Sequence, residues 1–456
     1  MVDKKTLIQE NPFKALLLLA VPIIVLLFFN ETYITLDTFF LSKLGNDVII
    51  AFGYISNIYY FINRLGKGVG RGVSSIIARL IGAKNYDDIN NIALHGLLII
   101  IIVSIASLII FGLLADWLIH LIVPDHQFSY VFIYMECMIF FIIFICLSEY
   151  LVELLNGEGD TRLSTIIMTF GIFLNAILDY IFIFPFKLGI LGASLGTSVS
   201  YVITTLIFAY IYLVRKNHIV KFTFSEFNFD STILREILIN TVPIILDSLV
   251  ITLSGLFLMV ELKNYAPAVT IVAFVILLRI QNFLFTPNSS LSRSCNIVVG
   301  HLFGAKRFED VKSIFHKSII VSFLINGLIA LILIQFLNVI LGFFTNQLNV
   351  MVEVRNISCI VIADLIIFSV IFNSNQALIA IGHSTKSFSS VIVRFVSLFA
   401  FVFMLCHMLQ FGKFGVLISL LLSDLVQAAY SYITFRYHIL KVKNNHDDVL
   451  KENTPS

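Results

Sequence analysis

Twelve apolar runs, each long enough to cross a lipid bilayer, constrain this chain more than any other feature of its sequence. A helix that spans the hydrocarbon core needs about 20 mostly apolar residues. Backbone groups in lipid must be paired within the protein, so such runs fold as helices. Only 13% of the 456 residues are charged, against roughly 25% in a soluble domain. The sequence therefore predicts an all-α integral membrane protein with twelve transmembrane helices, at approximately 14–42, 48–72, 91–115, 129–154, 162–184, 189–214, 238–262, 268–297, 315–342, 352–381, 386–409 and 413–436.

The distribution of positive charge predicts the orientation of these spans. Cytoplasmic loops carry an excess of lysine and arginine. One set of loops, together with both ends of the chain, holds most of these residues, whereas the opposite loops hold only Lys43, Lys187, Lys263, Arg355 and Lys413. We therefore expect a multi-pass protein of the cell membrane with both termini in the cytoplasm. Because the basic residues lie in loops, they predict topology, and no nucleic-acid partner is expected.

The chain contains an internal repeat. Residues 75–92 read SIIARLIGAKNYDDINNI and residues 297–314 read IVVGHLFGAKRFEDVKSI, so the two GAK triplets are 222 residues apart. Val21-Pro22 and Val242-Pro243 recur at nearly the same offset. Two halves of equal orientation are a recurring design of membrane transporters. The predicted organisation is a cytoplasmic N-terminus (1–13), two pseudo-symmetric six-helix lobes (14–214 and 238–438), a cytoplasmic linker (215–237) and a cytoplasmic tail (439–456).

Two acids stand out because they lie within apolar spans of the first half. Asp37 and Asp179 each lie a few residues before the predicted outer end of their span, roughly 8–10 Å below it at 1.5 Å per residue. An ionisable residue inside a membrane span is costly and marks a candidate functional site. Asn175 is four residues before Asp179 and shares its helix face, and Thr197 falls at a similar depth on the next span. Small residues on that span, including Gly192 and Gly196, would let it approach closely.

These groups predict a site for a coupling ion, either H⁺ or Na⁺. Low dielectric disfavours an ionised carboxylate, so such acids can exchange protons near neutral pH. Oxygen ligands also suit hard cations, and for Na⁺ the predicted ligands are Asp37, Asp179 and Asn175. Aromatic side chains beside the acids are candidates for an organic-cation cavity through cation–π attraction, and we name Tyr33, Tyr134 and Tyr180.

The second half does not repeat this arrangement, since Leu258 and Val402 replace the two acids. Its own ionisable residues include Glu261 and Asp364, and ion pairs with Arg279 or Arg293 are open alternatives. In the first half, Glu153 is expected to be solvated near the inner mouth, and whether the glycines of 66–72 bend their helix is left open. The five cysteines are scattered among apolar segments and predict neither a disulfide nor a metal site.

Several motifs together resemble those of the multidrug and toxic compound extrusion (MATE) transporters. They are IGAKNYDD (81–88), FGAKRFED (303–310), GEGDTR (157–162), FLNAILDYIFIF (173–184) and LGILGASLGTSVS (188–200). Because the acids lie in the N-terminal half, the resemblance is to the DinF-like branch. It implies that Asp37 is the cation-responsive acid, that Asn175, Asp179 and Thr197 form the polar cluster around it, and that Tyr33 and Tyr134 are the accompanying tyrosines.

The expected function is alternating-access antiport. A monomer would exchange H⁺ or Na⁺ for small organic cations or amphiphiles, in contact with membrane lipids and without a further cofactor. A flippase for lipids or lipid-linked oligosaccharides, which shares the architecture, is the alternative. A channel is less favoured. A membrane-embedded enzyme is also less favoured, because the sequence contains no His/Glu metal pair, nucleophile elbow or phosphate-binding loop.

Overall fold

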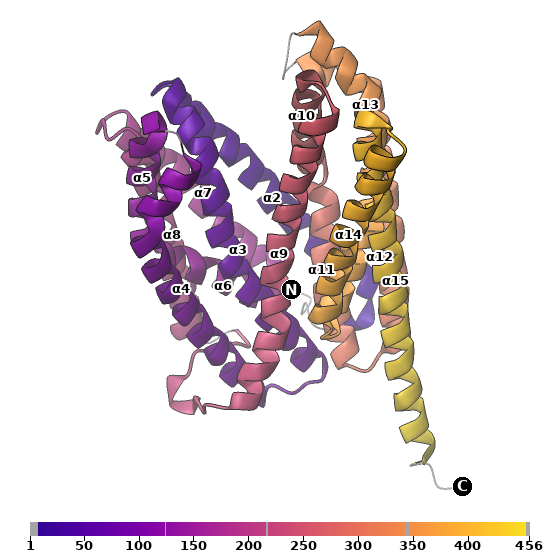
Figure 1. Ribbon diagram of the computed structural model, residues 1–456. Coiled ribbons are helices and arrows are strands. Elements are labelled where there is room, and N and C mark those ends of the chain that lie inside the picture. The colour runs from indigo at the N-terminus through magenta and orange to yellow at the C-terminus, as the bar shows by residue number, and fades with distance from the viewer. Residues whose placement is uncertain (1–7, 124, 216–217, 343–346, 453–456) are drawn as a thin grey trace. The chain divides into compact units, whose positions relative to one another are not determined.

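The computed structural model describes residues 8–123, 125–215, 218–342 and 347–452 (Figure 1). Throughout these ranges the regular structure is helical, without a strand, which confirms the predicted all-α class. The helices are α2 (Pro12–Ser42), α3 (Asn46–Gly82), α4 (Asp87–Ile122), α5 (Asp125–Phe140), α6 (Ile142–Gly157), α7 (Thr161–Ile183), α8 (Ile190–Leu213), η1 (Phe224–Glu226), α9 (Ser231–Tyr265), α10 (Ala268–Leu284), α11 (Thr286–Gly304), α12 (Phe308–Gly342), α13 (Leu348–Ala380), α14 (Ser384–Val402), the π-helical turn η2 (Phe403–Met408) and α15 (Gly412–Glu452).

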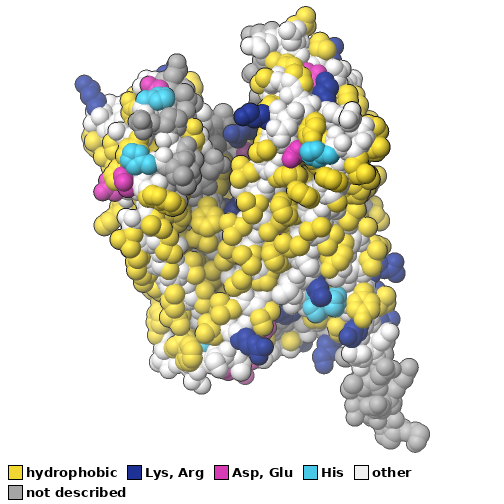
Figure 2. All heavy atoms as spheres, viewed as in Figure 1, with side chains coloured by type: hydrophobic (Ala, Val, Ile, Leu, Met, Phe, Trp, Pro, Cys, Tyr) yellow, Lys and Arg dark blue, Asp and Glu magenta, His cyan; other side chains and the backbone are white. Residues whose placement is uncertain are grey.

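The helices account for all twelve predicted spans. Among the described residues, nine helices are long and apolar enough to cross a bilayer, and the bent pairs α5–α6 and α10–α11 raise the number to eleven. The remaining predicted span, 48–72, falls within α3, which is 37 residues long, and this span carries three basic residues, Arg64, Lys67 and Arg71. Figure 2 shows hydrophobic side chains over much of the face in view, with charged side chains mainly toward its two ends.

The internal repeat extends to the backbone. Lys84 and Lys306, at the ends of the two GAK triplets, both adopt a left-handed conformation, with φ of 59° and 57°. Gly159 and Gly382, which follow the fourth and tenth spans, have φ of 84° and 85°. Residues other than glycine rarely adopt this left-handed backbone conformation. The offsets, 222 and 223 residues, are nearly the same, so the two halves turn in the same way at these corresponding places.

The two halves differ in two places, where one half has a bent helix pair and the other has a continuous helix. α5 and α6 meet at an angle of 60°, whereas the corresponding α13 is continuous. α10 and α11 meet at 47°, whereas the corresponding α3 is continuous. Pro287 lies in the first turn of α11, where a residue without an N–H group is tolerated, so it favours a new helix start there.

The chain divides into two compact units, which are described separately. One is Val21–Ile245, and the other combines Met1–Ala20 with Leu246–Ser456. α2 and α9 each begin in one unit and continue into the other, and each has a proline, Pro22 or Pro243, close to that point. The predicted lobe boundaries instead place α2 from residue 14 onward in one lobe and α9 from residue 238 onward in the other; those boundaries remain a prediction.

Within the Val21–Ile245 unit, glycines let α3 contact two helices closely. A Cβ atom at Gly66 or Gly70 would lie 2.8 Å from α6, and one at Gly68 or Gly72 would lie 2.6 or 2.3 Å from α9. These distances are too short for real contacts, so only glycine fits. α3 is one continuous helix through the GKGVGRG stretch. It presents one smooth face to α6 and another to α9.

Candidate functional site

The two acids predicted to form the ion site lie close together within one unit. Asp37 on α2 is 3% exposed and Asp179 on α7 is fully buried. The negative charge of Asp37 acts directly on the Asp179 carboxyl. Two like charges in a low-dielectric environment repel each other, so binding a proton or cation between them is favoured. The geometry thus contains the juxtaposition on which the predicted site depends.

Asn175 and Thr197 complete the polar cluster around Asp179. Asn175 donates from Nδ2 to Asp179 Oδ1 at 3.0 Å, as their spacing of one helical turn predicts. The same amide nitrogen donates to Thr197 Oγ1 on α8 at 3.4 Å. The second carboxylate oxygen, Asp179 Oδ2, is buried and accepts no hydrogen bond from any residue in the described ranges. A buried oxygen in this state is costly and is ready to bind a proton or a cation.

Close approach of α8 encloses the cluster. A Cβ atom at Gly196 would lie 2.1 Å from Asp179 Oδ1 and 2.9 Å from the Asp179 backbone nitrogen. At Gly192, one turn earlier, it would lie 2.8 Å from the carbonyl carbon of Phe182 on α7. The small residues of α8 therefore do what the sequence predicted, and Gly196 shapes the wall directly against the acid.

The three candidate tyrosines differ in their placement. Tyr134 is buried; its hydroxyl group interacts with Thr197 and lies within electrostatic reach of both Asp37 and Asp179. Ser194 holds its backbone by donating to the Tyr134 carbonyl at 2.8 Å. The structure thus brings Tyr134 to the cluster.

Tyr180 lies outside the polar cluster, and its predicted place in a substrate cavity stays a prediction. It is 54% exposed, and its ring lies 5.4 Å from that of Phe184. The physical reason is helical geometry: neighbouring residues on a helix are about 100° apart, so Tyr180 points away when Asp179 points inward. The side chain of Tyr33 lies outside the described residues.

A second polar cluster in the same unit was not assembled from the sequence. The hydroxyl groups of Tyr59 on α3 and Tyr201 on α8 are 2.9 Å apart. Tyr201 also reaches Asn63 Oδ1 at 3.0 Å and Glu149 Oε1 at 3.5 Å. Lys67 Nζ lies 3.3 Å from the same Glu149 oxygen. Tyr201 and Lys67 thus contact one buried carboxylate on α6, and Tyr59 and Asn63 contact Tyr201.

One turn along the same helices, a second ion pair repeats the first. Arg71 Nε lies 3.5 Å from Glu153 Oε1, and Asn156 donates to Glu153 Oε2 at 3.2 Å. Glu153 is only 6% exposed. The expectation that Glu153 is solvated is therefore wrong, because the glycine face of α3 brings Arg71 within reach of it.

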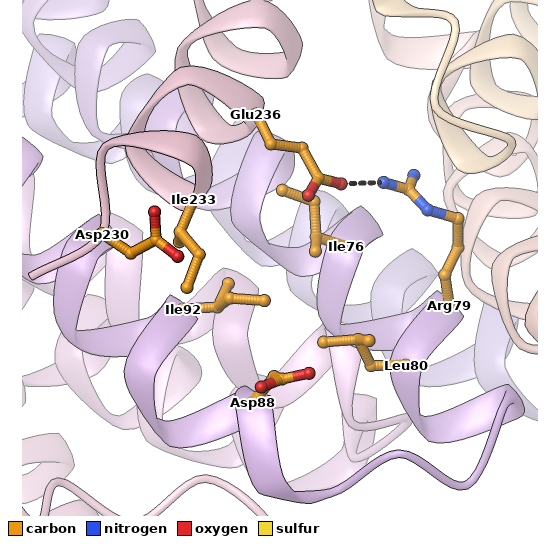
Figure 3. Close-up of a pocket in the computed structure, with 8 residues that line it drawn as sticks. All are labelled: Ile76, Arg79, Leu80, Asp88, Ile92, Asp230, Ile233 and Glu236. Atoms are coloured by element: carbon orange, nitrogen blue, oxygen red, sulfur yellow. Dashed lines mark hydrogen bonds and ion pairs between the residues drawn. The ribbon is translucent and has the colours of Figure 1, made fainter. Parts of the chain in front are cut away.

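A cavity of about 280 Å³ lies away from these clusters, where the end of α3, the start of α4 and the start of α9 meet (Figure 3). Its lining residues are Ile76, Arg79, Leu80, Asp88, Ile92, Asp230, Ile233 and Glu236. Arg79 Nη2 and Glu236 Oε1 form an ion pair at 3.2 Å across it. The cavity is therefore separate from the candidate ion site, and its ion pair fastens α9 to α3.

The other unit contains a different arrangement of charge. Arg394 on α14 pairs with Asp424 on α15 through both carboxylate oxygens. Asp364 on α13 interacts with that Asp424 carboxyl group and accepts a hydrogen bond from Gln281 at 3.3 Å. The arginine whose positive charge stabilises these two acids is thus Arg394, which was not among the partners proposed for Asp364. Leu258 and Val402 are buried in an apolar cluster, as the broken symmetry predicted.

Comparison with known proteins identifies the family. The MatE family model matches residues 13–181 and 243–404, which is most of the chain and includes parts of both repeats. The chain belongs to the MatE family. The chain is 29% identical over 262 residues to the multidrug export protein MepA of Staphylococcus saprophyticus. An FAD transporter of Shewanella oneidensis is 28% identical over 221 residues.

These sequence matches are partial, whereas the structural matches are nearly complete. The aligned segments span 56% and 47% of this chain, and 57% and 49% of the two relatives, so the chain spans about half the length of each. An outward-facing multidrug resistance MATE transporter has a TM-score of 0.92 at 24% identity, covering 97% of this chain and 99% of that one. A transporter from Pyrococcus furiosus, described as having a binding pocket of reverse polarity, has a TM-score of 0.91 at 24% identity, with the same coverage. The latter two establish the fold alone.

Proposed function

We propose that this protein exports small organic cations or amphiphiles across the cell membrane in exchange for a coupling ion bound at Asp37 and Asp179. Family membership and the names of the relatives support transport and export. The observation that carries the coupling is the buried acid pair, in which Asp179 Oδ2 accepts no hydrogen bond from the part of the chain that the structure describes. The reported relatives are named for drug export and FAD transport, which favours an exporter over a lipid flippase.

A proton fits the site more simply than Na⁺. Asn175 turns its NH₂ group, not its oxygen, toward Asp179 and Thr197. A cation needs oxygen ligands, so Na⁺ would require the amide to turn over and both hydrogen bonds to break. A proton needs only Asp179 Oδ2, and it removes one of the two mutually repelling charges without moving the amide.

The proposed cycle uses this change of charge. When both acids are ionised, their repulsion holds the cluster open. Protonation removes the repulsion, which lets the part of α2 around Asp37 pack against α7. The membrane potential contributes about 2.3 kcal/mol per charge per 100 mV to this step. Binding of the coupling ion thereby changes the packing of the helices, which couples ion entry to substrate export in an alternating-access carrier. In this scheme the carrier is a monomer with both termini in the cytoplasm, and we assign it to the DinF-like branch.

The experiment is ion-driven dye uptake in inverted membrane vesicles. We expect Asp37→Asn to abolish uptake of a fluorescent organic cation, because an amide cannot bind or release the coupling proton. Asp116→Asn is the matched control, since Asp116 is 71% exposed on α4 and pairs only with the nearby His120 among the described residues. Full uptake by Asp37→Asn would contradict the assignment. Imposing a pH gradient or a Na⁺ gradient separately identifies the ion.

A further inference from the structure

The second unit contains three buried asparagines whose amide oxygens accept no hydrogen bond from the part of the chain that the structure describes. They are Asn288 on α11, Asn326 on α12 and Asn373 on α13, and all three are fully buried. The amide nitrogen of Asn288 is also unpaired within the described ranges. A buried amide oxygen without a partner is costly, so three of them in one helix bundle indicate a bound water molecule or ion.

Two of these asparagines join α12 to α13. Asn326 Nδ2 donates to Ser369 Oγ and to the Leu365 carbonyl, both at 2.9 Å. One turn away, Asn373 Nδ2 donates to Ser322 Oγ and to the Ser369 carbonyl, both at 2.8 Å. A carbonyl partner requires a donor, which fixes the orientation of both amides. Each amide thus uses its NH₂ group between the helices and keeps an unpaired oxygen at the same interface.

Asn288 lies at the level of these two amides, on a third helix. α11, α12 and α13 pack against one another in pairs, and a short turn joins α11 to α12, so these two run antiparallel. Asn288 is 16 residues before the end of α11 and Asn326 is 18 residues after the start of α12, so their levels differ by about 3 Å. The contact of Ser318 Oγ with Cys295 Sγ, at 3.3 Å, agrees with this register. Asn288 is two turns from Cys295 on the same face of α11.

A break in the membrane-spanning backbone adjoins this polar layer. α10 and α11 meet at an angle of 47°, and Asn288 lies in the first turn of α11, directly after Pro287. At the break, the ring of Phe285 contacts the ring of Phe372 on α13, with centroids 4.5 Å apart. Phe372 precedes Asn373, so the start of α11 faces the part of α13 that carries this amide. Interrupted membrane helices recur at the ion and substrate sites of transporters.

The chemistry of the layer suits an alkali-metal cation. Amide and hydroxyl oxygens are hard ligands, which suit hard cations, whereas calcium sites use carboxylates as well. A cation in a low-dielectric interior also needs a negative charge nearby. Asp364 and Asp424 outnumber their shared partner Arg394. Asp364 is five residues before Ser369 on α13, which is about 7.5 Å along the helix, so the excess charge lies beside the layer.

From this geometry we propose that α11, α12 and α13 form a binding site for an alkali-metal cation, with the amide oxygens of Asn288, Asn326 and Asn373 as ligands. The site belongs to the second unit and is separate from the Asp37–Asp179 pair. It goes beyond the proposed function, because the bound cation ties the start of α11 to α12 and α13 whichever ion drives transport.

The test measures thermal unfolding of the full-length protein purified in detergent. A fluorescent dye that reacts with thiols reports unfolding, because Cys146, Cys295 and Cys406 are buried in the folded protein. The melting temperature is compared in NaCl, KCl and choline chloride at equal ionic strength. We expect NaCl or KCl to raise the melting temperature of the wild type by about 2–4 °C over choline chloride, with saturation at high salt, because the cation binds only the folded protein.

Asn288→Leu should lose this rise. Its amide has no hydrogen bond to the rest of the described chain, so leucine removes a ligand without breaking a contact, and in choline chloride this variant should be at least as stable as the wild type. Asn288→Asp adds a negative charge to the site and should enlarge the rise, which decides the question if the leucine variant does not fold. Asn296→Leu is the matched control on the same helix. Asn296 donates to the Gln376 carbonyl at 2.9 Å, so this variant should be less stable in all three salts and keep the rise.

The other outcomes would overturn the site. Equal melting temperatures of the wild type in all three salts would mean that the buried amides bind water only. A rise that Asn288→Leu keeps would mean that the cation binds elsewhere. If Asp37→Asn loses that rise, the cation binds at the acid pair, and the site proposed here fails while the coupling site stands. If Asp37→Asn keeps the rise and Asn288→Leu loses it, the site stands, whether or not Asp37→Asn abolishes dye uptake.

Discussion

Replacing Gly196 by alanine tests whether close helix packing positions the coupling acid. The added methyl group would lie 2.1 Å from Asp179 Oδ1, so that oxygen must move away by about 1 Å to restore normal contact. The movement breaks the 3.0 Å hydrogen bond from Asn175. The backbone nitrogen of Asp179, at 2.9 Å, also opposes the methyl group, so α8 itself must shift.

The expected cost follows from these changes. Overpacking costs about 1–3 kcal/mol, and losing a hydrogen bond to a charged group costs about 1.5–3 kcal/mol. Alanine recovers about 0.5–1 kcal/mol through its better helix propensity. The free energy of unfolding should therefore fall by about 2–5 kcal/mol.

The assay is denaturant unfolding of the solubilised protein, combined with ion-driven ethidium uptake. Gly112→Ala is the control: Gly112 lies in a helix of the same unit, and a Cβ atom there would have nothing within 4 Å. We expect Gly112→Ala to be unchanged or slightly more stable and fully active. Equal stability and equal uptake for the two variants would refute the reasoning that Gly196 sets the position of Asp179.

Two further predictions concern charge elsewhere in the chain. Arg394→Met leaves the buried Asp424 and Asp364 without their shared positive charge, so it should lower the free energy of unfolding by about 3–5 kcal/mol. Lys312→Met is the control, because Lys312 pairs with the exposed Glu309, and it should change the free energy of unfolding little. Comparable losses for the two variants would contradict this prediction. Hydrogen bonds from the side chain and backbone of Thr232 lower the pKa of Asp230 below its usual 3.8, so this cap of α9 stabilises the protein above pH about 4 and loses that effect as the pH falls through the lowered pKa. Asp230→Ala should therefore reduce the melting temperature more at pH 7 than at a pH below 3.8, and an equal reduction at both would argue against the cap.

The sequence predicted the features that depend on pattern over long stretches. Twelve apolar runs, the repeat and the spacing of Asn175 and Asp179 are all visible in one dimension, because span length and helical period are fixed by geometry. The left-handed turns at Lys84 and Lys306 show that the repeat extends to the backbone at these two positions.

The second polar cluster was not predicted, because it depends on which helices touch. Glu149 and Lys67 are 82 residues apart, and nothing in their local sequence joins them. A usable signal existed: glycines at 66 and 70 alternate with basic residues at 67 and 71, and glutamates at 149 and 153 have the same spacing of four. Tyr180 shows the converse, since it is next to Asp179 in the sequence and yet 54% exposed, whereas Asp179 is fully buried.

The two places where the backbone passes between the compact units have a mechanical consequence. The chain crosses only at Ala20–Val21 and at Ile245–Leu246, and each crossing lies inside a helix within three residues of Pro22 or Pro243. Proline removes a backbone hydrogen bond, so a helix bends more cheaply beside it. If one unit swings against the other during turnover, the covalent chain must flex at these two hinges, and stiffening either one should slow turnover without altering the affinity for ions or drugs.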